Sequence, residues 1–459
     1  MAHFLVSATH KSSGKTTVSL GVCAALARMG HAVQPFKKGP DFIDPMWLSA
    51  ASARTCHNLD FNTMPNDEIL GLFARHSQGA RTSVIEGNNG LFDGTDIEGG
   101  NSNAAMAKLL GAPVLLVVDC AGMARGVAPL LMGYEAFDAD LRIGGVILNN
   151  VASTRHETKL RAAVERYCDI PVIGAVRRDH SLRIAERHLG LVPTEEWGQA
   201  KTQIDAAADA IAEQIDLDAL LAMADVANLV TAPPSAPPTV RPADVRIGVA
   251  RDSAFAFYYP GDLEAMRAAG AELVTFSPLH DTALPDIDGL FIGGGFPETH
   301  LSALEANASL REEIRNAIEN GLPTYAECGG LMYLARNIEW QGMTGEMVGV
   351  IPAHIVVGDK PRGHGLVRLR ETGAAPWPRL TENDPPVEIC AHEFHYSDVG
   401  HLDGDTVFAY EVARGYGTDG RSDGIVYKNM LASYAHLRDT TRNHWTARFV
   451  EFVRSNIDR

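Results

Sequence analysis

The sequence predicts an α/β fold of two domains, the first of them built around a parallel sheet. In both halves of the chain, short apolar runs alternate with stretches of helical periodicity. The runs are apolar at consecutive positions, as in strands that helices cover on both faces. A proline-rich segment separates the halves, and a length of 459 residues allows two or three domains at about 150 residues each.

The first half contains four predicted strands. They are the runs FLVSA, SVIE, VLLVVD and GVILN, at residues 4–8, 83–86, 114–119 and 145–149. Apolar residues at helical spacing predict helices over 16–29 and 102–110. Strands that alternate with helices form parallel sheets, because a parallel connection has to cross over one face of the sheet.

Residues 226–245 are predicted to be a semi-rigid linker, because five prolines stand at 233, 234, 237, 238 and 242. The runs RIGVA, LVTF, GLFIGG and PTYAE follow it and repeat the pattern of the first half, at residues 246–250, 273–276, 289–294 and 323–327. We therefore predict one domain over 1–225 and another over 246–459, joined by the linker.

The composition is that of a globular protein, with 46% hydrophobic and 21% charged residues. With 57 acidic against 40 basic residues the net charge is −17, which repels nucleic acid. The longest dense apolar run, residues 114–118, is far shorter than the roughly 20 residues that span a bilayer. The six cysteines form no CxxC pair, and the first residues lack a signal-peptide pattern. We expect a cytoplasmic protein whose partners include neither nucleic acid nor membrane.

The segment between the predicted strand at 4–8 and the helix at 16–29 has the pattern of a phosphate-binding loop. Backbone N–H groups at a helix N-terminus bind phosphate, a lysine neutralises it and a hydroxyl can ligate Mg²⁺. We expect Lys15 and Thr16 to do so. The predicted nucleotide-binding residues are Ser12, Ser13, Gly14, Lys15, Thr16 and Thr17. Thr9 stands where the first glycine of such loops is usual, so a polar turn that caps a helix is the alternative.

Charged residues follow two further runs. Glu86 ends the strand at 83–86, and a carboxylate at the carboxyl end of a parallel strand beside a phosphate-binding loop is placed to ligate Mg²⁺. In the segment KKGPD, Lys37 and Lys38 can hold phosphate or a substrate carboxylate, and Asp41 can hold a second Mg²⁺. A solvated turn is the alternative for KKGPD. Asp93 follows Glu86 in a loop that contains glycine.

Cys328 is the predicted nucleophile of the second half. It lies between the run PTYAE and a glycine pair that opens a helix, the layout of a nucleophile elbow. The glycines after another strand, Gly293, Gly294 and Gly295, suit an oxyanion hole. His436, at the end of a candidate strand over 431–436, is the predicted base. The other cysteines are predicted to be core residues.

Two histidines three residues apart, His392 and His395, form a separate pattern. This spacing suits metal ligands, but no third ligand is evident, so we expect packing or substrate contact.

With these motifs in order, the chain resembles the cobyrinate a,c-diamide synthase family over nearly its whole length. The matching segments are KSSGKTT, KKGPDFIDP, EGNNGLFDG, KLLGAPVLLVVD, ERHLGL, GGGFPE, YAECGG, HEFHYS and LASYAHL. The resemblance implies a P-loop domain similar to dethiobiotin synthetase, followed by a class I glutamine-amidotransferase-like domain. It also implies that the enzyme amidates peripheral carboxylates of a tetrapyrrole, with glutamine, ATP and Mg²⁺.

By the same resemblance, Glu86, Asp93 and Asp41 lie in stretches that handle metal and substrate. We assign Asp93, Lys37 and Lys38 to the substrate and its acyl phosphate. A polycarboxylate tetrapyrrole also needs local positive charge despite the net charge of −17. Candidate sources are Arg177, Arg178, His180, Arg183, Arg187, His188, Lys360, Arg362 and His364.

The sequence departs from the family pattern at several loops. Asn88 and Asn89 replace the usual apolar pair after Glu86, and Asn101-Ser102-Asn103 is also unlike the common pattern. Leu437 and Arg438 follow His436, so the usual His-x-Glu acid is absent. A branch of the family that is thought to amidate sirohaem resembles these motifs more closely, so sirohaem or its metal-free precursor is the alternative substrate.

An alternative of another class is a P-loop ATPase switch without amidase activity. Its signature lysine would precede Lys15 by five residues, where His10 stands. Such a switch also has no need of Cys328. A homodimer is left open as the oligomeric state.

Overall fold

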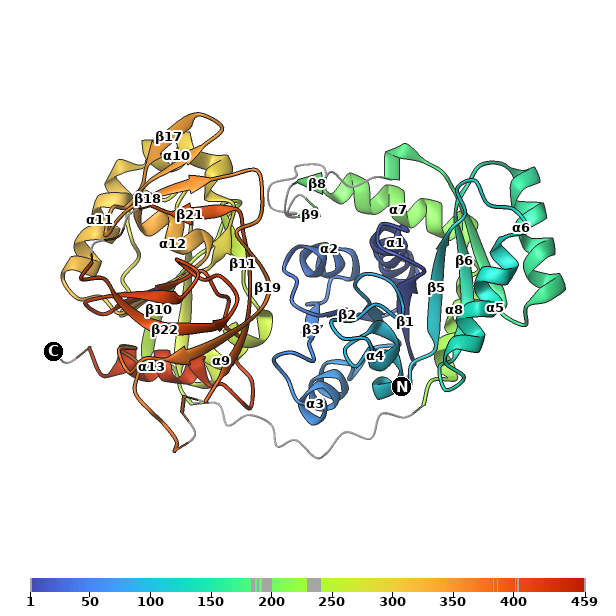
Figure 1. Cartoon of the computed structure of the whole chain (residues 1–459), viewed down its shortest axis with the longest axis horizontal. Helices are drawn as coiled ribbons and strands as arrows, with labels where there is room; N and C mark the ends of the chain where they lie inside the picture. Colours follow the sequence, from blue (N-terminus) through green and yellow to red (C-terminus); the bar gives the residue numbers. More distant parts are fainter. Residues whose placement is uncertain are drawn as a thin grey trace. The chain divides into compact units, whose positions relative to one another are not determined.

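The computed structural model describes residues 2–182, 186–187, 190–191, 200–228, 241–382, 384–385, 387–400, 402 and 404–457 (Figure 1). The chain divides into two compact units, Met1–Ser235 and Ala236–Arg459. Residues 229–240 of the predicted linker lie outside the described residues. Each unit is described by itself.

The first unit has a seven-stranded parallel sheet in the order β3-β2-β4-β1-β5-β6-β7. Its strands are β1 (His3–Ala8), β2 (Val33–Lys38), β3 (His57–Leu59), β4 (Thr82–Glu86), β5 (Val114–Asp119), β6 (Ile143–Val151) and β7 (Val172–Arg177). Its helices are α1 (Lys15–Arg28), α2 (Ile43–Ser52), α3 (Asn66–His76), α4 (Asn103–Leu110), α5 (Val127–Phe137), α6 (Thr154–Tyr167), α7 (Ala200–Gln214) and α8 (Leu217–Asp225). A 3₁₀ turn (His180–Leu182) and the short pair β8 (Glu186–Arg187) and β9 (Gly190–Leu191) follow β7.

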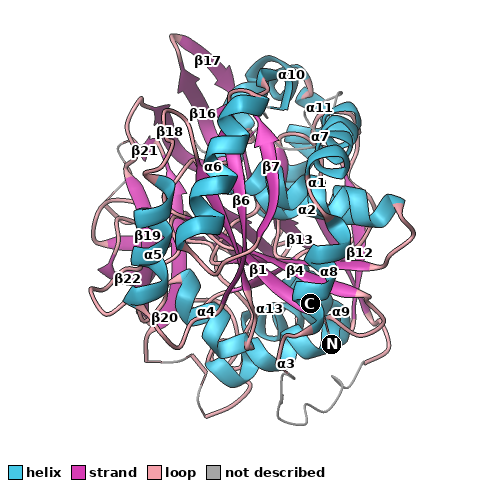
Figure 2. Ribbon diagram, turned by 90° about the vertical axis from the view of Figure 1, so that its right-hand side faces the viewer, coloured by secondary structure: helices cyan, strands magenta, loops and turns pink. Residues whose placement is uncertain are grey.

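Helices cover both faces of this sheet. One face packs against α3, α4, α5 and α6 in a single apolar core, and Figure 2 shows α5 and α6 to the left of β6 and β7. On α1, Gly21 permits a close approach to α7, because a Cβ there would lie 2.3 Å from the Ile211 Cγ1. The two-sided burial explains why the strands are apolar at consecutive positions.

The strand order places the nucleotide motif at a topological switch point. β1 lies between β4 and β5, and the chain leaves β1 through residues 9–14 into α1. In doubly wound sheets, ligands bind at the carboxyl ends of the strands where the order reverses. The carboxyl ends of β1, β2 and β4 therefore bring the predicted site residues of this unit to one edge.

The second unit has a nine-stranded mixed sheet in the order β12-β10-β13-β15-β24-β23-β22-β19-β20. Its strands are β10 (Val245–Ala250), β12 (Ala271–Phe276), β13 (Gly289–Ile292), β15 (Thr324–Glu327), β19 (Gly363–Glu371), β20 (Ile389–His395), β22 (Val407–Arg414), β23 (Ser422–Tyr427) and β24 (Met430–Ser433). The other strands are β11 (Phe255–Phe257) with β14 (Gly294–Gly295), and β16 (Ala335–Trp340), β17 (Met343–Glu346), β18 (Ile351–Val357) and β21 (Ser397–Val399). The helices are α9 (Pro260–Ala268), α10 (Leu301–Ala306), α11 (Ala308–Glu319), α12 (Gly329–Leu334) and α13 (Trp445–Arg454), with a 3₁₀ turn at Pro297–His300.

The sheet of the second unit is only partly parallel. The five strands from β12 to β24 are parallel, but β23, β22, β19 and β20 extend the sheet in antiparallel pairs. Buried and partly exposed residues alternate along much of β19. Such strands carry no long apolar run, because only one of their faces is fully buried, and the search for apolar runs misses them.

Among the helices that the structure describes, none is both long and apolar enough to cross a membrane.

Candidate active site

The phosphate-binding loop is held between β1, α1 and β6. Gly14 caps α1 with a φ of +94°, in the left-handed region that favours glycine. A Cβ on Gly14 would also lie 2.2 Å from the Asn149 Nδ2. That same nitrogen donates to the Ser13 carbonyl oxygen over 2.8 Å. Asn149 therefore fixes the loop from the end of β6, a role that sequence reasoning did not assign to it.

Lys15 and Thr16 form the first turn of α1. Lys15 is buried, and burial lowers its pKa to about 8 although Glu86 opposes the shift. A bound phosphate would restore the charge balance of this ammonium. The Thr16 hydroxyl donates to the Glu86 Oε1 over 2.8 Å, which joins α1 to the end of β4.

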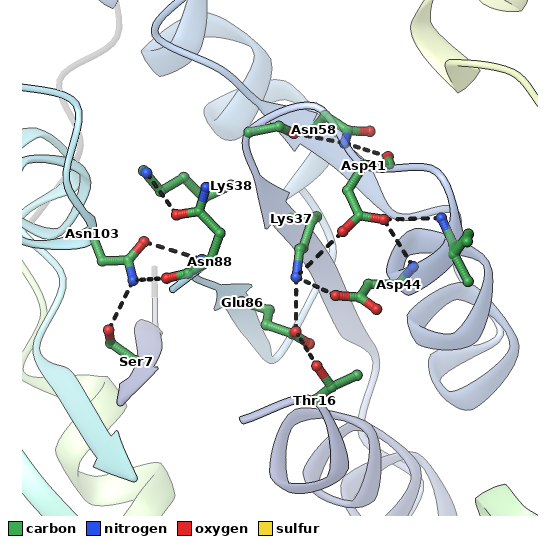
Figure 3. Close-up of polar contacts among 12 residues, drawn as sticks. Ser7, Thr16, Lys37, Lys38, Asp41, Asp44, Asn58, Glu86, Asn88 and Asn103 are labelled. Atoms are coloured by element: carbon green, nitrogen blue, oxygen red, sulfur yellow. Dashed lines mark hydrogen bonds and ion pairs between the residues drawn. The ribbon is translucent and has the colours of Figure 1, made fainter. Parts of the chain in front are cut away.

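Lys37 is the centre of an ion-paired cluster (Figure 3). Its Nζ lies 2.9 Å from the Glu86 Oε1 and 3.7 Å from the Asp41 Oδ2, and it also donates to Asp44. Burial opposes the charge of Lys37, but these three carboxylates raise its pKa well above the ordinary value. Lys37 was predicted to hold substrate, but its charge is already balanced by protein groups.

Asp41 lies in the turn after β2, and Asp44 lies in the first turn of α2. The Asp41 Oδ1 accepts the N–H groups of Ile43 and Asp44 over 2.9 and 3.1 Å. Burial, together with the nearby Asp44, raises the pKa of Asp41 to about 7 although Lys37 opposes the rise. The structure thus brings Asp41 into the same cluster as Glu86, and adds Asp44, which the sequence did not single out.

Glu86 is fully buried, and only one of its oxygens is engaged. Among the described residues, no hydrogen bond reaches its Oε2. Burial raises the pKa of Glu86, against the effect of Lys37. A buried carboxylate oxygen without a partner, next to the Thr16 hydroxyl, is the hard oxygen donor set that Mg²⁺ prefers. The residues present therefore fit the metal.

Asp93 shapes the loop after β4. Its exposed carboxylate accepts the Gly90 N–H over 2.9 Å, and a Cβ on Gly90 would lie 2.6 Å from it. Its predicted contact with substrate stays a prediction.

Cys328 lies on a sharp turn between β15 and α12. It has a φ of +47° and a ψ of −103°, a strained conformation for a residue with a side chain. Its N–H donates to the Ser433 carbonyl oxygen over 2.7 Å. Burial, with Glu298 nearby, raises the pKa of the Cys328 thiol. The thiol is therefore protonated at neutral pH and needs a base to become a nucleophile.

His436 has an orienting acid on the neighbouring strand. β15 and β24 are adjacent and parallel, and the His436 Nδ1 lies 3.3 Å from the Glu327 Oε2. The other Glu327 oxygen accepts the Tyr325 hydroxyl over 2.7 Å and the Leu437 N–H over 3.0 Å. Sequence reasoning missed Glu327 because it sought the acid after the histidine. The available signal was an acid directly before the predicted nucleophile.

The predicted strand over 431–436 needs correction. β24 ends at Ser433, and His436 instead forms an isolated bridge with His392, whose carbonyl oxygen accepts the His436 N–H over 2.8 Å. The two imidazole rings are stacked with 4.9 Å between centroids. Burial lowers the pKa of His392 well below its ordinary value, so the ring against the predicted base is neutral.

The loop of Gly293, Gly294 and Gly295 lies close to His436 and to Gly329, the residue after Cys328. A Cβ on Gly294 would lie 2.6 Å from the His436 Cε1, and one on Gly329 would lie 2.9 Å from the Gly295 nitrogen. The prediction for Gly293 needs correction, because its N–H already donates to the Tyr258 hydroxyl over 2.8 Å. The oxyanion role of Gly294 and Gly295 stays a prediction.

Asp423 is a second residue that the sequence did not reveal. It is fully buried and accepts hydrogen bonds from the Thr418 and Ser433 hydroxyls and from three backbone N–H groups, those of Gly424, Tyr434 and Ala435. These contacts hold the end of β24, where the Ser433 carbonyl receives the Cys328 N–H. Asp423 therefore fixes the backbone on which both Cys328 and His436 depend.

The remaining candidate residues are His395 and the positively charged residues proposed for the substrate, and they lie apart from these clusters or outside the described residues. His395 packs in the interior, with its ring 3.9 Å from that of Tyr434 between centroids. The side chains of Arg177, Arg178, Lys360, Arg362 and His364 are exposed. Arg183 and His188 lie outside the described residues, as do the side chains of His180 and Arg187.

Comparisons with known proteins give a family for each of the two units. Residues 4–192 match the model of the CobQ/CobB/MinD/ParA nucleotide binding domain, and residues 246–443 match that of the CobB/CobQ-like glutamine amidotransferase domain. A protein of Magnetococcus marinus named cobyrinate a,c-diamide synthase is 48% identical over 98% of this chain and 96% of its own length. Proteins of the same name from Dehalococcoides mccartyi and Methanosarcina barkeri are 40% and 37% identical, over 97% and 99% of this chain and 97% and 96% of their own lengths. The chain therefore belongs to the cobyrinate a,c-diamide synthase family and is a glutamine-dependent, ATP-using ligase.

Proposed function

We propose that this enzyme amidates peripheral carboxylates of cobyrinate, using ammonia that it releases from glutamine. One observation carries the proposal. A single chain has a buried cysteine one residue after the glutamate of a His–Glu pair, and also a phosphate-binding loop whose Thr16 hydroxyl donates to a buried carboxylate that is paired with Lys37. The first arrangement can hydrolyse an amide, and the second can transfer a phosphoryl group to a carboxylate.

In the glutaminase step, His436 takes the proton of the Cys328 thiol, and the sulfur attacks the side-chain amide carbon of glutamine. Glu327 holds the imidazole in one orientation and stabilises its positive charge. His436 then gives its proton to the departing nitrogen, which leaves as ammonia. Water hydrolyses the resulting thioester to glutamate and frees the thiol.

In the ligase step, a substrate carboxylate attacks the γ-phosphorus of ATP, which gives an acyl phosphate and ADP. This step is needed because a carboxylate has no good leaving group. The backbone N–H groups of residues 12–17 and the ammonium of Lys15 hold the phosphates. Thr16 and Glu86 would hold Mg²⁺, with Asp41 at a second position, and the metal supplies positive charge against the transferred phosphoryl oxygens. Ammonia then attacks the acyl carbon, and phosphate leaves.

We also propose a location, two further contacts and an oligomeric state for this enzyme. The enzyme works in the cytoplasm, in keeping with its six free cysteines. Asp93 contacts the substrate, and the backbone of Gly294 and Gly295 contributes to the oxyanion hole. The oligomeric state to test is a homodimer, by light scattering of the full chain.

The test is mass spectrometry of the products formed with ATP, Mg²⁺, glutamine and, in parallel, cobyrinate, sirohaem or sirohydrochlorin. Each amidation replaces a hydroxyl by an amino group and lowers the product mass by about one unit. Two amidations of cobyrinate are expected. Turnover only on sirohaem or its precursor would contradict the proposed substrate, and ATP hydrolysis without any amide would contradict the proposed reaction.

Two variants separate the sites. Cys328→Ala is expected to abolish amidation from glutamine and to retain it with free ammonia at high concentration. Lys15→Ala is expected to abolish amidation from either nitrogen source. If Cys328→Ala lost both activities while the protein stayed folded, the proposed division of labour would be wrong.

A further inference from the structure

Two consecutive lysines end β2, and they serve different partners. Successive side chains of a strand point to opposite faces of the sheet. Figure 3 shows Lys37 directed toward Glu86 and Lys38 toward Asn88. The sequence treated the two as equivalent, whereas the structure separates them.

Lys38 is a buried cation that lacks a carboxylate. Its side chain is 6% exposed, and its Nζ donates to the neutral Asn88 Oδ1 over 2.9 Å. Within the described part of the chain, no carboxylate oxygen lies within 4.0 Å of this nitrogen, whereas Lys37 has three carboxylates. Burial lowers the pKa of Lys38 to about 8, with Lys37 adding to the effect and Asp60 opposing it. An anionic ligand would restore the charge balance.

The partner of Lys38 is itself held in place. An ammonium can only donate, so the oxygen of the Asn88 amide has to face it. The Asn88 N–H donates to the Asn103 Oδ1 over 3.2 Å, and its carbonyl oxygen accepts from the Asn103 Nδ2. A Cβ on Gly39 would lie 3.2 Å from the Asn88 Nδ2, so the turn after β2 confines the same amide.

Asn103 anchors this arrangement to the sheet. It is fully buried, and its Nδ2 also contacts the Ser7 Oγ at 2.9 Å and the Gly90 carbonyl oxygen at 3.0 Å. A Cβ on Gly87 would lie 2.6 Å from the Asn103 Cγ, so the loop after β4 is wrapped around this side chain. The position of Lys38 therefore depends on Asn88, and that of Asn88 on Asn103.

We propose that Lys38 binds the substrate carboxylate that is to be amidated, and that Asn88 and Asn103 are positioning residues that direct Lys38 toward it. The inference rests on the proposed function, because it needs a carboxylate substrate. An anionic oxygen could also come from ATP, but Lys15 and the loop N–H groups already serve the phosphates, so we assign Lys38 to the carboxylate. The proposed arrangement also gives a role to Asn88 and Asn103, two positions at which this sequence departs from the family's common pattern.

The experiment measures KM for the tetrapyrrole that the wild-type enzyme amidates, KM for ATP, kcat and glutaminase activity. Lys38→Met removes the charge and keeps the chain length. We expect it to raise KM for the tetrapyrrole about 10- to 100-fold, the effect of a lost charge-assisted hydrogen bond, with KM for ATP within about twofold. Asn88→Ala and Asn103→Ala are expected to raise the same KM by smaller factors. Asn89→Gly is the matched control, because Asn89 is exposed, has a φ of +35° and is expected to be neutral.

A double variant tests the positioning role. If Asn88 acts through Lys38, then Asn88→Ala added to Lys38→Met raises KM no further. Asn88→Asp is expected to raise KM more than Asn88→Ala, because a carboxylate there would compete with the substrate for Lys38. An unchanged KM for the tetrapyrrole in Lys38→Met, a rise in KM for ATP instead, or full additivity would overturn the inference. Each of these three outcomes is compatible with the proposed function, whereas absence of amidation by the wild-type enzyme would contradict that function itself.

Discussion

The acid that orients the catalytic histidine precedes the nucleophile in the chain. Glu327 ends β15, one residue before Cys328, and reaches His436 across the gap to the neighbouring strand. Its second oxygen accepts the Tyr325 hydroxyl and the Leu437 N–H, which fixes the direction of the carboxylate. A strained elbow and its supporting acid thus come from one short segment.

Glu327→Gln is expected to lower glutamine-dependent kcat about 10²- to 10⁴-fold, because the imidazolium loses its counter-charge and its tautomer is no longer fixed. Amidation from free ammonia should stay within about twofold of wild type. The matched control is Tyr325→Phe, which removes one hydrogen bond to the same carboxylate and leaves the contact with His436. Equal losses in the two variants would contradict the orienting role.

Single residues differed in how far the sequence could predict them. Cys328, Lys15, Thr16 and Glu86 could be singled out because each belongs to a local pattern with a known chemistry. Glu327, Asp423 and Asn149 could not, because their partners lie on other strands and no local pattern marks them. Such contacts become visible once the strand order is known.

The neighbouring strands β23 and β24 stabilise the backbone of the glutaminase site. β23 carries Asp423, and its carboxylate binds hydroxyls and N–H groups around the end of β24. Because an ionised carboxylate accepts every one of these bonds, a group with its own donors cannot replace it.

Asp423→Asn is expected to destabilise the protein by about 3 kcal/mol, the cost of breaking a buried, hydrogen-bonded charge network. Glutaminase activity should fall with it, since the backbone before His436 loses its anchor. Urea unfolding followed by fluorescence measures the loss of stability. Asp419→Asn is the control, because Asp419 is exposed and accepts two backbone N–H groups of its own turn. A loss that is no larger than in this control would contradict the anchoring role.

The helices α1 and α4 begin and end within a residue of the expected positions. Apolar runs predicted β1, β4, β5 and β6 of the first unit and β10, β12, β13 and β15 of the second, but they did not reveal β2, β3 or β7. They predicted the antiparallel extension from β23 to β20 poorly. Strands that expose one face mix polar and apolar residues, so their signal is weak in a single sequence. The length of β24 was also overestimated, because Tyr434 and Ala435 are buried without being part of the strand.

The chain as a whole combines two reactions, and only one of them is expected to need a metal ion. Among the residues that the structure describes, one carboxylate oxygen of Glu86 in the phosphoryl-transfer cluster has no hydrogen-bond partner, whereas the candidate glutaminase residues are a thiol, an imidazole and one carboxylate. Only the first donor set suits Mg²⁺.

Removal of divalent metal with a chelator is therefore expected to abolish amidation from both glutamine and ammonia, and to leave glutamate release from glutamine within about threefold. Glutamate release is measured with an enzyme-coupled assay, and added Mg²⁺ should restore amidation. Full amidation in the presence of chelator would contradict the metal assignment to Thr16 and Glu86.

The place of β24 in the sheet has a consequence for synthesis of the protein. β24 pairs with β15, the strand that ends just before Cys328, and His436 follows β24, although more than one hundred residues of chain separate the two strands. By contrast, the predicted phosphate-binding and metal-binding residues all lie within the first hundred residues. A chain still being translated therefore completes its ATP site long before its glutaminase. Because the predicted base His436 follows the last strand, we expect glutaminase activity only in chains that have been synthesised beyond β24.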